Sequence, residues 1–274
     1  MRPARARRPL ATLLAALATA TCLTVVAAPG AQAAEAGKYV ALGDSYAVAP
    51  GTRSYDDPND VCRRGPLTYP RLWAAQHTSY AFVEASCSGA TAAEIKTQQV
   101  PRLTADTTLV TVQAGGNDVG FVSVLQNCVL TLDDKECVAG VEAAKAAATG
   151  ALPGTLADTY AAVRAAAPNA RVIVVGYPRL YRIGGNCGVL GLSDTERTAL
   201  NSAADVLDSV LAQQAAHAGF TFLDPRPAFD AHAICSGNTT WVTSLEWDKL
   251  NESYHPNQAG HRDGYLAALN AITG

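Results

Sequence analysis

The sequence has no excess of basic residues. It has 21 lysines and arginines and 24 aspartates and glutamates, which gives a formal net charge of −3. A nucleic-acid partner requires a basic face that neutralises phosphates. The composition therefore argues against a nucleic-acid-binding protein.

Residue spacings that bind metals are also missing. The sequence has no C-x-x-C motif, and no histidine stands at ligand spacing beside a cysteine. Zinc sites in proteins need such sets of ligands. We therefore expect no zinc or calcium dependence, no other metal and no cofactor.

The one long apolar run lies at the N-terminus. Met1–Arg8 carries four arginines, Leu10–Ala28 is apolar, and Ala31-Gln32-Ala33 supplies small residues for a cleavage site. This order is typical of a secretory signal peptide, and the small residues that follow the Ala- and Thr-rich run disfavour a membrane anchor. We expect cleavage after Ala33 and an extracellular, secreted protein.

Residues 34–274 are then the mature chain. Its net charge is −7, because four arginines and no acidic residue leave with the signal. This length suits one α/β domain with its own core, and we find no internal repeat, low-complexity tract or linker in it. Such a domain needs no partner chain, so we expect a monomer.

The cysteines predict disulfides. Of seven in the chain, Cys22 leaves with the signal, and six remain. An even number in an exported protein implies disulfide bonds. Neighbouring positions along the chain suggest the pairs Cys62–Cys87, Cys128–Cys137 and Cys187–Cys235.

Strands and helices are predicted to alternate along the mature chain. Short apolar runs predict strands at 39–42, 80–85, 109–113, 171–176 and 220–223. Helical patterns cover 67–77, 141–167 with a possible break at Pro153-Gly154, 193–218 and two stretches that begin at 92 and 255. Residues 121–136 are expected to be an excursion stapled by a cystine, with a short loop between Cys128 and Cys137. This alternation is typical of a parallel sheet with helices on both faces, a three-layer α/β/α fold.

Polar residues follow three of these strands at points where a turn leads into the next segment. Ser45 follows Gly43-Asp44, Gly89 lies in S-C-S-G-A-T, and Asn117 lies in G-G-N-D. The carboxyl ends of parallel strands share one edge of the sheet, where ligands bind in open α/β folds. Ser45 can supply a nucleophilic hydroxyl and an N–H, Gly89 a second N–H that no Cβ blocks, and Asn117 a side-chain amide.

Acyl transfer by a serine also needs a base, and His255 is the best of five histidines. It stands before a proline at a predicted helix start near the C-terminus. The other four, His77, His217, His232 and His261, fit ordinary positions in or near predicted helices and loops. Ser45 and His255 are therefore the candidate catalytic pair.

The blocks G-D-S-Y, S-G-A-T, G-G-N-D and Y-H-P-N-x-x-G-H occur in this order. Together they resemble the four blocks of the SGNH (GDSL-type) serine hydrolases, in particular the secreted actinobacterial esterase, lipase and phospholipase branch. The resemblance implies a flavodoxin-like α/β/α sandwich, Ser45 as nucleophile and His255 as base. It also implies an oxyanion hole made of the Ser45 and Gly89 N–H groups and the Asn117 side chain, and it agrees with the disulfide pairs given above.

One position departs from the family pattern, which places an aspartate three residues before the histidine. Here that residue is Glu252. Three groups could orient His255: the Glu252 carboxylate, the backbone carbonyl of Ser253, or Asp248. We favour the Ser253 carbonyl, because glutamate's extra methylene must fit a tight turn.

The substrate is less defined than the chemistry. No G-x-S-x-G motif is present, which disfavours an ordinary α/β-hydrolase lipase. Secretion and the resemblance favour a lipid ester, with phospholipase A1 or B type activity and transient contact with a membrane or micelle surface. The alternatives are a carbohydrate acetyl esterase, a short-chain arylesterase, or a non-catalytic binding module. Nine residues are candidates to line an acyl groove: Val48, Ala49, Val119, Phe121, Val122, Leu125, Tyr181, Trp241 and Trp247.

Overall fold

The computed structural model describes residues 37–131, 133–187 and 191–274. The expected signal peptide, residues 1–33 with its cleavage site, lies outside the described residues. Among the described helices, none combines the length and the apolar character needed to cross a membrane.

A parallel sheet of five strands forms the middle layer, in the order β2-β1-β3-β4-β5. The strands are β1 (Lys38–Gly43), β2 (Ala81–Glu84), β3 (Leu109–Gln113), β4 (Arg171–Val175) and β5 (Thr221–Leu223). The central strands β1 and β3 are almost wholly buried because helices cover both faces, which is why their sequences are continuous apolar runs. The predicted fold class and strand positions are confirmed, and the strand order is that of flavodoxin-like folds.

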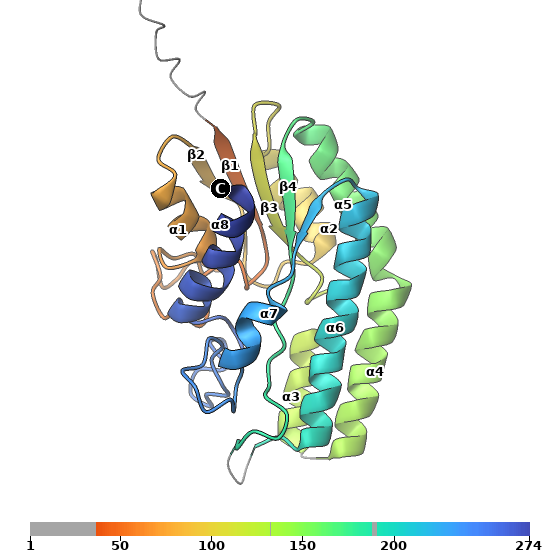
Figure 1. Ribbon diagram of the computed structural model, residues 1–274. Helices are drawn as coiled ribbons and strands as arrows, with labels where there is room; N and C mark the ends of the chain where they lie inside the picture. The colour runs from red at the N-terminus through yellow and green to blue at the C-terminus, as the bar shows by residue number, and fades with distance from the viewer. Residues whose placement is uncertain (1–36, 132, 188–190) are drawn as a thin grey trace, which may run out of the picture. The chain divides into compact units, whose positions relative to one another are not determined.

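Helices form the outer layers. They are α1 (Tyr69–Gln76), α2 (Ala92–Glu94), η1 (Ile95–Gln99), η2 (Val100–Arg102), α3 (Phe121–Thr131), α4 (Asp134–Gly150), α5 (Leu152–Ala166), α6 (Asp194–His217), α7 (Arg226–Phe229), η3 (Asp230–His232), η4 (Gly260–Leu266) and α8 (Ala267–Thr273). In Figure 1, α1 and α8 lie on one side of the sheet, and α2, α5 and α6 lie on the other. The helix α3 and the adjoining parts of α4 and α6 extend beyond the carboxyl edge of the strands.

The stapled excursion at 121–136 is helical, and the prediction of a short loop between Cys128 and Cys137 was wrong. Phe121, Leu125 and Cys128 follow helical spacing and turn inward in α3. The Asp133 side chain then accepts hydrogen bonds from the N–H groups of Lys135 and Glu136, and so caps a new helix, α4. The two cysteines in this segment therefore join two helices rather than closing a loop.

Two other helix boundaries differ from the sequence pattern, and one is confirmed. The 141–167 stretch divides after Gly150, because Pro153 lies in the first turn of α5. His255 precedes the last helical segment, which begins at Gln258, and the Asn257 side chain accepts a hydrogen bond from the Gly260 N–H there. The capping box of Ser193 and Glu196 at the start of α6 is present as predicted.

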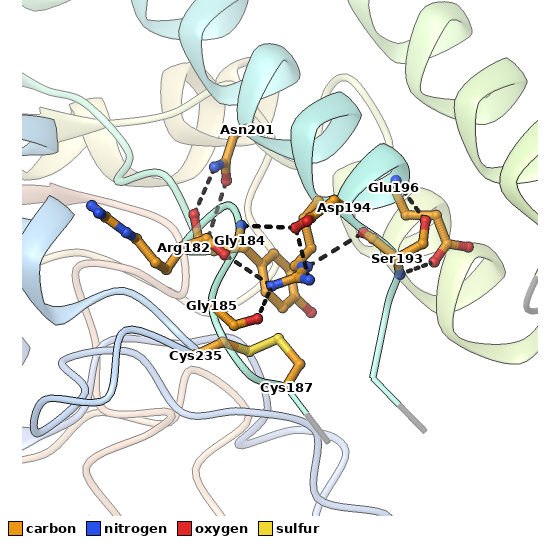
Figure 2. The surroundings of a disulfide bond; sticks show 11 residues. Arg182, Gly184, Gly185, Cys187, Ser193, Asp194, Glu196, Asn201 and Cys235 are labelled. Atoms are coloured by element: carbon orange, nitrogen blue, oxygen red, sulfur yellow. Dashed lines mark hydrogen bonds and ion pairs between the residues drawn. A yellow bond between two sulfur atoms is a disulfide. The ribbon is translucent and has the colours of Figure 1, made fainter. Parts of the chain in front are cut away.

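The disulfides are Cys62–Cys87, Cys128–Cys137 and Cys187–Cys235, the pairs expected from the sequence. Figure 2 shows the last of them, which ties the segment before α6 to the segment after α7. The Arg197 guanidinium donates to the Arg182 and Gly185 carbonyls, and Asn201 bonds both backbone groups of Tyr181. The start of α6 thus holds this connection beside the carboxyl edge of the sheet.

Candidate active site

The sheet brings two of the predicted blocks together at its centre. Ser45 follows β1 and Asn117 follows β3, and these strands are neighbours. The strand β2 lies on one side of β1, whereas β3, β4 and β5 follow one another on the other side. Ligands bind in such folds at the carboxyl ends of the two strands where this change of side occurs, here β1 and β3. Beside Ser45, both backbone groups of Gly43 are bonded by the buried Gln99 side chain, which fixes the end of β1.

Ser45 and His255 are in direct contact although 210 positions separate them. The His255 Nε2 lies 2.9 Å from the Ser45 Oγ, and its Nδ1 lies 2.8 Å from the Ser253 carbonyl oxygen. A carbonyl can only accept a hydrogen bond, so Nδ1 must carry the ring proton. Nε2 is then free to accept the serine proton, which is the arrangement a general base requires.

The environment keeps this imidazole neutral. His255 is half-buried, and the loss of solvation around its ring lowers the pKa to about 4. The hydrogen bond to the Ser253 carbonyl and the nearby Glu252 carboxylate oppose this shift without reversing it. The ring is therefore neutral at pH 7, with its proton on Nδ1 and with Nε2 free to accept.

Neither candidate carboxylate bonds the histidine. Glu252 is 6% exposed and accepts hydrogen bonds from the Gly51 N–H at 2.7 Å and from the Arg63 guanidinium and the Tyr55 hydroxyl. Asp248 has an 80% exposed side chain and lies 3.9 Å from the Lys249 ammonium. Of the three groups considered from the sequence, the Ser253 carbonyl is thus the one in contact with the ring.

Ser45, Gly89 and Asn117 line the same pocket and carry three potential hydrogen-bond donors. Within the described residues, the N–H groups of Ser45 and Gly89 are not used in hydrogen bonds to the protein. The Asn117 Nδ2 lies 3.1 Å from the Ala90 carbonyl, which fixes the amide beside Gly89. Gly89 has φ of +82°, and a Cβ there would meet no protein atom. Glycine is needed here for its backbone conformation rather than to relieve crowding within the chain.

The other four histidines lie elsewhere. His77 stacks on Trp73, His232 stacks on Trp241, and His217 lies in the last turn of α6. His261 is buried, and its Nδ1 accepts a hydrogen bond from the Tyr69 N–H at 3.2 Å.

An apolar pocket of about 520 Å³ opens beside the Ser45 hydroxyl. This volume is within the usual range of small-molecule sites, about 300–1,000 Å³. Five of the nine candidate groove residues line it: Val119, Phe121, Val122, Leu125 and Trp247. The remaining four do not: Val48 and Ala49 are wholly buried, Tyr181 is also buried, and Trp241 packs on His232 and Phe229. Residues of α4 and α6 that the sequence patterns did not single out also line the pocket: Ala144, Ala148, Ala203, Ala204 and Leu207.

The model of the GDSL-like lipase/acylhydrolase family matches residues 41–262, which include all four sequence blocks. The chain belongs to this family. It is a carboxylic ester hydrolase of the lipase type, and lipases from Streptomyces are among the proteins it resembles. Lipase 1 of Streptomyces coelicolor is 44% identical over 255 residues, which are 93% of this chain and 94% of that protein.

Two solved structures of GDSL-like relatives match closely. The crystal structure of phospholipase A1 from Streptomyces albidoflavus NA297 has a TM-score of 0.82 and 46% identity, and the match covers 86% of this chain and 99% of that one. The extracellular lipase from Streptomyces rimosus has a TM-score of 0.83 and 41% identity, over 87% and 100% of the two chains.

Residues of the G-D-S-Y block also make hydrogen bonds to distant segments, which the sequence patterns did not reveal. Burial raises the pKa of the Asp44 carboxyl to about 7, and that carboxyl accepts hydrogen bonds from the Tyr46 N–H at 2.9 Å and the Tyr177 hydroxyl at 2.5 Å. The Tyr46 hydroxyl donates to the Tyr254 carbonyl at 2.6 Å. Tyr254 has φ of +62°, an uncommon conformation for a bulky residue. Through this hydrogen bond, Tyr46 holds the loop that carries His255. The Tyr46 N–H bond to Asp44 is local, but no local pattern could indicate the contacts with Tyr177 and Tyr254, because they join distant segments.

Proposed function

We propose that this hydrolase cleaves carboxylic esters of lipids, with phospholipase A1 or B type activity, through a covalent acyl-enzyme on Ser45. The observation that carries the proposal is the continuous hydrogen-bonded series from the Ser45 hydroxyl through His255 to the Ser253 carbonyl, at one end of an apolar pocket. The pocket suits an acyl chain, and the relatives include a protein named phospholipase A1.

The residues present account for both halves of the reaction. His255 Nε2 takes the proton of the Ser45 hydroxyl while Oγ bonds to the ester carbonyl carbon. The N–H groups of Ser45 and Gly89 and the Asn117 amide donate to the oxyanion that forms. His255 then gives its proton to the leaving alcohol. Water, deprotonated by the same ring, attacks the acyl-enzyme and releases the fatty acid.

We propose a Ser–His dyad in which the Ser253 carbonyl orients the ring. The carbonyl accepts the Nδ1 proton at 2.8 Å, whereas Glu252 is engaged by Gly51 and Arg63. Glu252 therefore acts as an anchor between the loop after β1 and the loop that carries His255.

The variant Glu252→Ala tests this assignment. We expect kcat to fall by less than about tenfold, while the free energy of unfolding falls by about 1–3 kcal/mol because the Gly51 N–H and Arg63 lose a buried acceptor. Steady-state kinetics and urea denaturation measure the two effects separately. A fall in kcat near 10⁴-fold, the size seen when a triad carboxylate is replaced, would contradict the dyad.

The pH dependence of kcat/KM gives a second test. The base must be neutral, and its pKa in the free enzyme is lowered to about 4. Activity on a dissolved ester should therefore persist well below pH 6.5 and fall as the pH drops through about 4. An acid limb centred near 6.5 would contradict this account.

The same shift predicts how stability varies with pH. In the folded chain, burial lowers the pKa of His255 to about 4 and that of His261 to about 3. The unfolded chain binds these protons near pH 6.5, so acid favours unfolding. The part of the free energy of unfolding that these two histidines contribute should be full above about pH 6.5 and be lost down to about pH 3–4. The buried carboxyls of Asp44 and Asp208, whose pKa values burial raises to about 7 and about 8, contribute in the opposite direction over this range, so the variant is compared with the unmodified chain. In His261→Asn the slope measured by urea denaturation should be smaller; an unchanged slope would contradict the assignment.

Substrate class is tested by the products. Mature protein is incubated with phosphatidylcholine and with a short-chain aryl ester, beside a Ser45→Ala control. We expect fatty acid from phosphatidylcholine, absent in the control. Accumulated lysophospholipid would indicate cleavage of one chain, and its absence cleavage of both. Turnover of the aryl ester alone would replace the lipid assignment by a short-chain or carbohydrate esterase.

We also propose that the protein is secreted and acts as a monomer. The N-terminal pattern, three disulfides and an extracellular relative support secretion. Culture supernatant should contain a chain that begins at Ala34. An N-terminus at Met1 in a membrane fraction would contradict cleavage after Ala33.

A further inference from the structure

Exposed apolar side chains gather at the mouth of the pocket. Six large apolar residues in the described part of the chain are exposed, and four of them line this pocket. Val122 and Leu130 belong to α3, and Trp247 and Leu250 belong to the segment between η3 and η4. Leu130 is 66% exposed and Trp247 is 65% exposed. Apolar side chains gathered around a pocket mark an interaction surface more often than scattered ones do. We call these four residues the apolar rim.

The arrangement of α3 holds two residues of the rim, Val122 and Leu130, in place. Val122, Gln126, Val129 and Leu130 occupy one stripe of the helix and all line the pocket. On another side of α3, the buried Cys128 is bonded to Cys137 of α4. The helix is thus held against α4 while its apolar stripe stays open to solvent.

Charge around the rim is balanced. The helix α3 contains no charged residue. On the loop, Glu246 pairs with Arg53, and Asp248 lies near Lys249. The residues after position 33 carry a net charge of −7. A neutral rim on an acidic protein fits a zwitterionic surface and disfavours an anionic one.

We propose that the apolar rim docks the pocket mouth onto the surface of zwitterionic phospholipid aggregates. This inference rests on the proposed lipid substrate and identifies how the enzyme meets it. Trp247 enters the interfacial layer, where its large amphipathic ring is favoured, and Val122, Leu130 and Leu250 contact the acyl region. A phospholipid can then move from the aggregate into the pocket without exposing its chains to water.

Binding is measured without catalysis, in the Ser45→Ala chain. Vesicles of phosphatidylcholine are compared with vesicles of phosphatidylglycerol by co-sedimentation and tryptophan emission. Trp73 is 2% exposed and Trp241 is covered by His232 and Phe229, so a shift of emission to shorter wavelength reports Trp247. We expect the shift with phosphatidylcholine, little with phosphatidylglycerol, and none when Trp247→Phe is added.

The role of the rim in turnover is measured as a ratio. Turnover of vesicle phosphatidylcholine is divided by turnover of a dissolved short-chain ester, which cancels any loss of folded enzyme. In Leu130→Ser/Trp247→Ser the ratio should fall by about tenfold or more, because the loss of buried apolar area weakens docking. Val61→Ser is the matched control: Val61 is 85% exposed but does not line the pocket, and the ratio should change by less than about twofold.

Four results would overturn the proposal: no binding to phosphatidylcholine, stronger binding to phosphatidylglycerol, an equal loss in Val61→Ser, or a dimer in sedimentation that Leu130→Ser converts to a monomer. The last result would assign the rim to a second copy of the chain. Failure of the lipid-substrate proposal is distinguishable, because the Ser45→Ala chain would then bind vesicles that the unmodified enzyme does not hydrolyse.

Discussion

Replacing Ser45 by alanine should lower kcat by about 10⁴–10⁶-fold, the largest effect expected of any single substitution in this protein. The change removes the hydroxyl that contacts His255 Nε2, and with it the covalent intermediate. The Ser45 N–H and the Asn117 amide remain, so a small rate above that of water should persist. Steady-state hydrolysis of a dissolved ester measures the change, and the melting temperature serves as the control for folding.

The double variant Ser45→Ala/His255→Ala gives this prediction a sharper form. If Ser45 and His255 act as one unit, removing either one already abolishes the contribution of the other to kcat. The double variant should therefore be about as slow as either single variant. If the two losses multiplied, His255 would be acting on something other than Ser45, and the proposed dyad would be wrong.

Asn117→Ala should lower kcat by about 10²–10³-fold with little change in KM. Its amide is held at the end of β3 by the Ala90 carbonyl, beside the unused N–H group of Gly89. A donor placed there stabilises charge that develops in the transition state more than it stabilises the bound substrate.

Asn117→Asp is the matched control for shape. It keeps the size of the side chain but replaces the donor by a negative charge, so its kcat should be at least as low as that of the alanine variant. Comparison of kcat with KM for both variants measures the effect. A loss below about fivefold in either variant would contradict a role for Asn117 in the oxyanion hole.

Much of the fold could be predicted from the sequence because local signals agreed with the global arrangement. The buried runs at Tyr39–Leu42 and Leu109–Gln113 correspond to central strands, and Ser193 with Glu196 marked the start of α6. The prediction failed around Cys128 and Cys137, where a short loop was expected. There the cap at Asp133 and the helical spacing of apolar residues indicate two helices.

The candidate site likewise has residues that the sequence could indicate and contacts that it could not. Ser45, Gly89, Asn117 and His255 could be named as candidates because their side chains, or the lack of one, suit the proposed chemistry. The group that orients His255 stayed open, because a backbone carbonyl such as that of Ser253 has no sequence signature. The contacts of Asp44 with Tyr177 and of Tyr46 with Tyr254 join segments more than a hundred residues apart, so only the folded chain reveals them.

Covalent labelling of the mature protein by an organophosphonate at neutral pH tests the central claim most directly. Because an unactivated serine does not react, labelling requires the base that the structure places at Ser45. We predict one adduct per chain, mapped by mass spectrometry to the peptide that contains Ser45 and lost in His255→Ala. An unlabelled Ser45, or an adduct that persists without His255, would contradict the account.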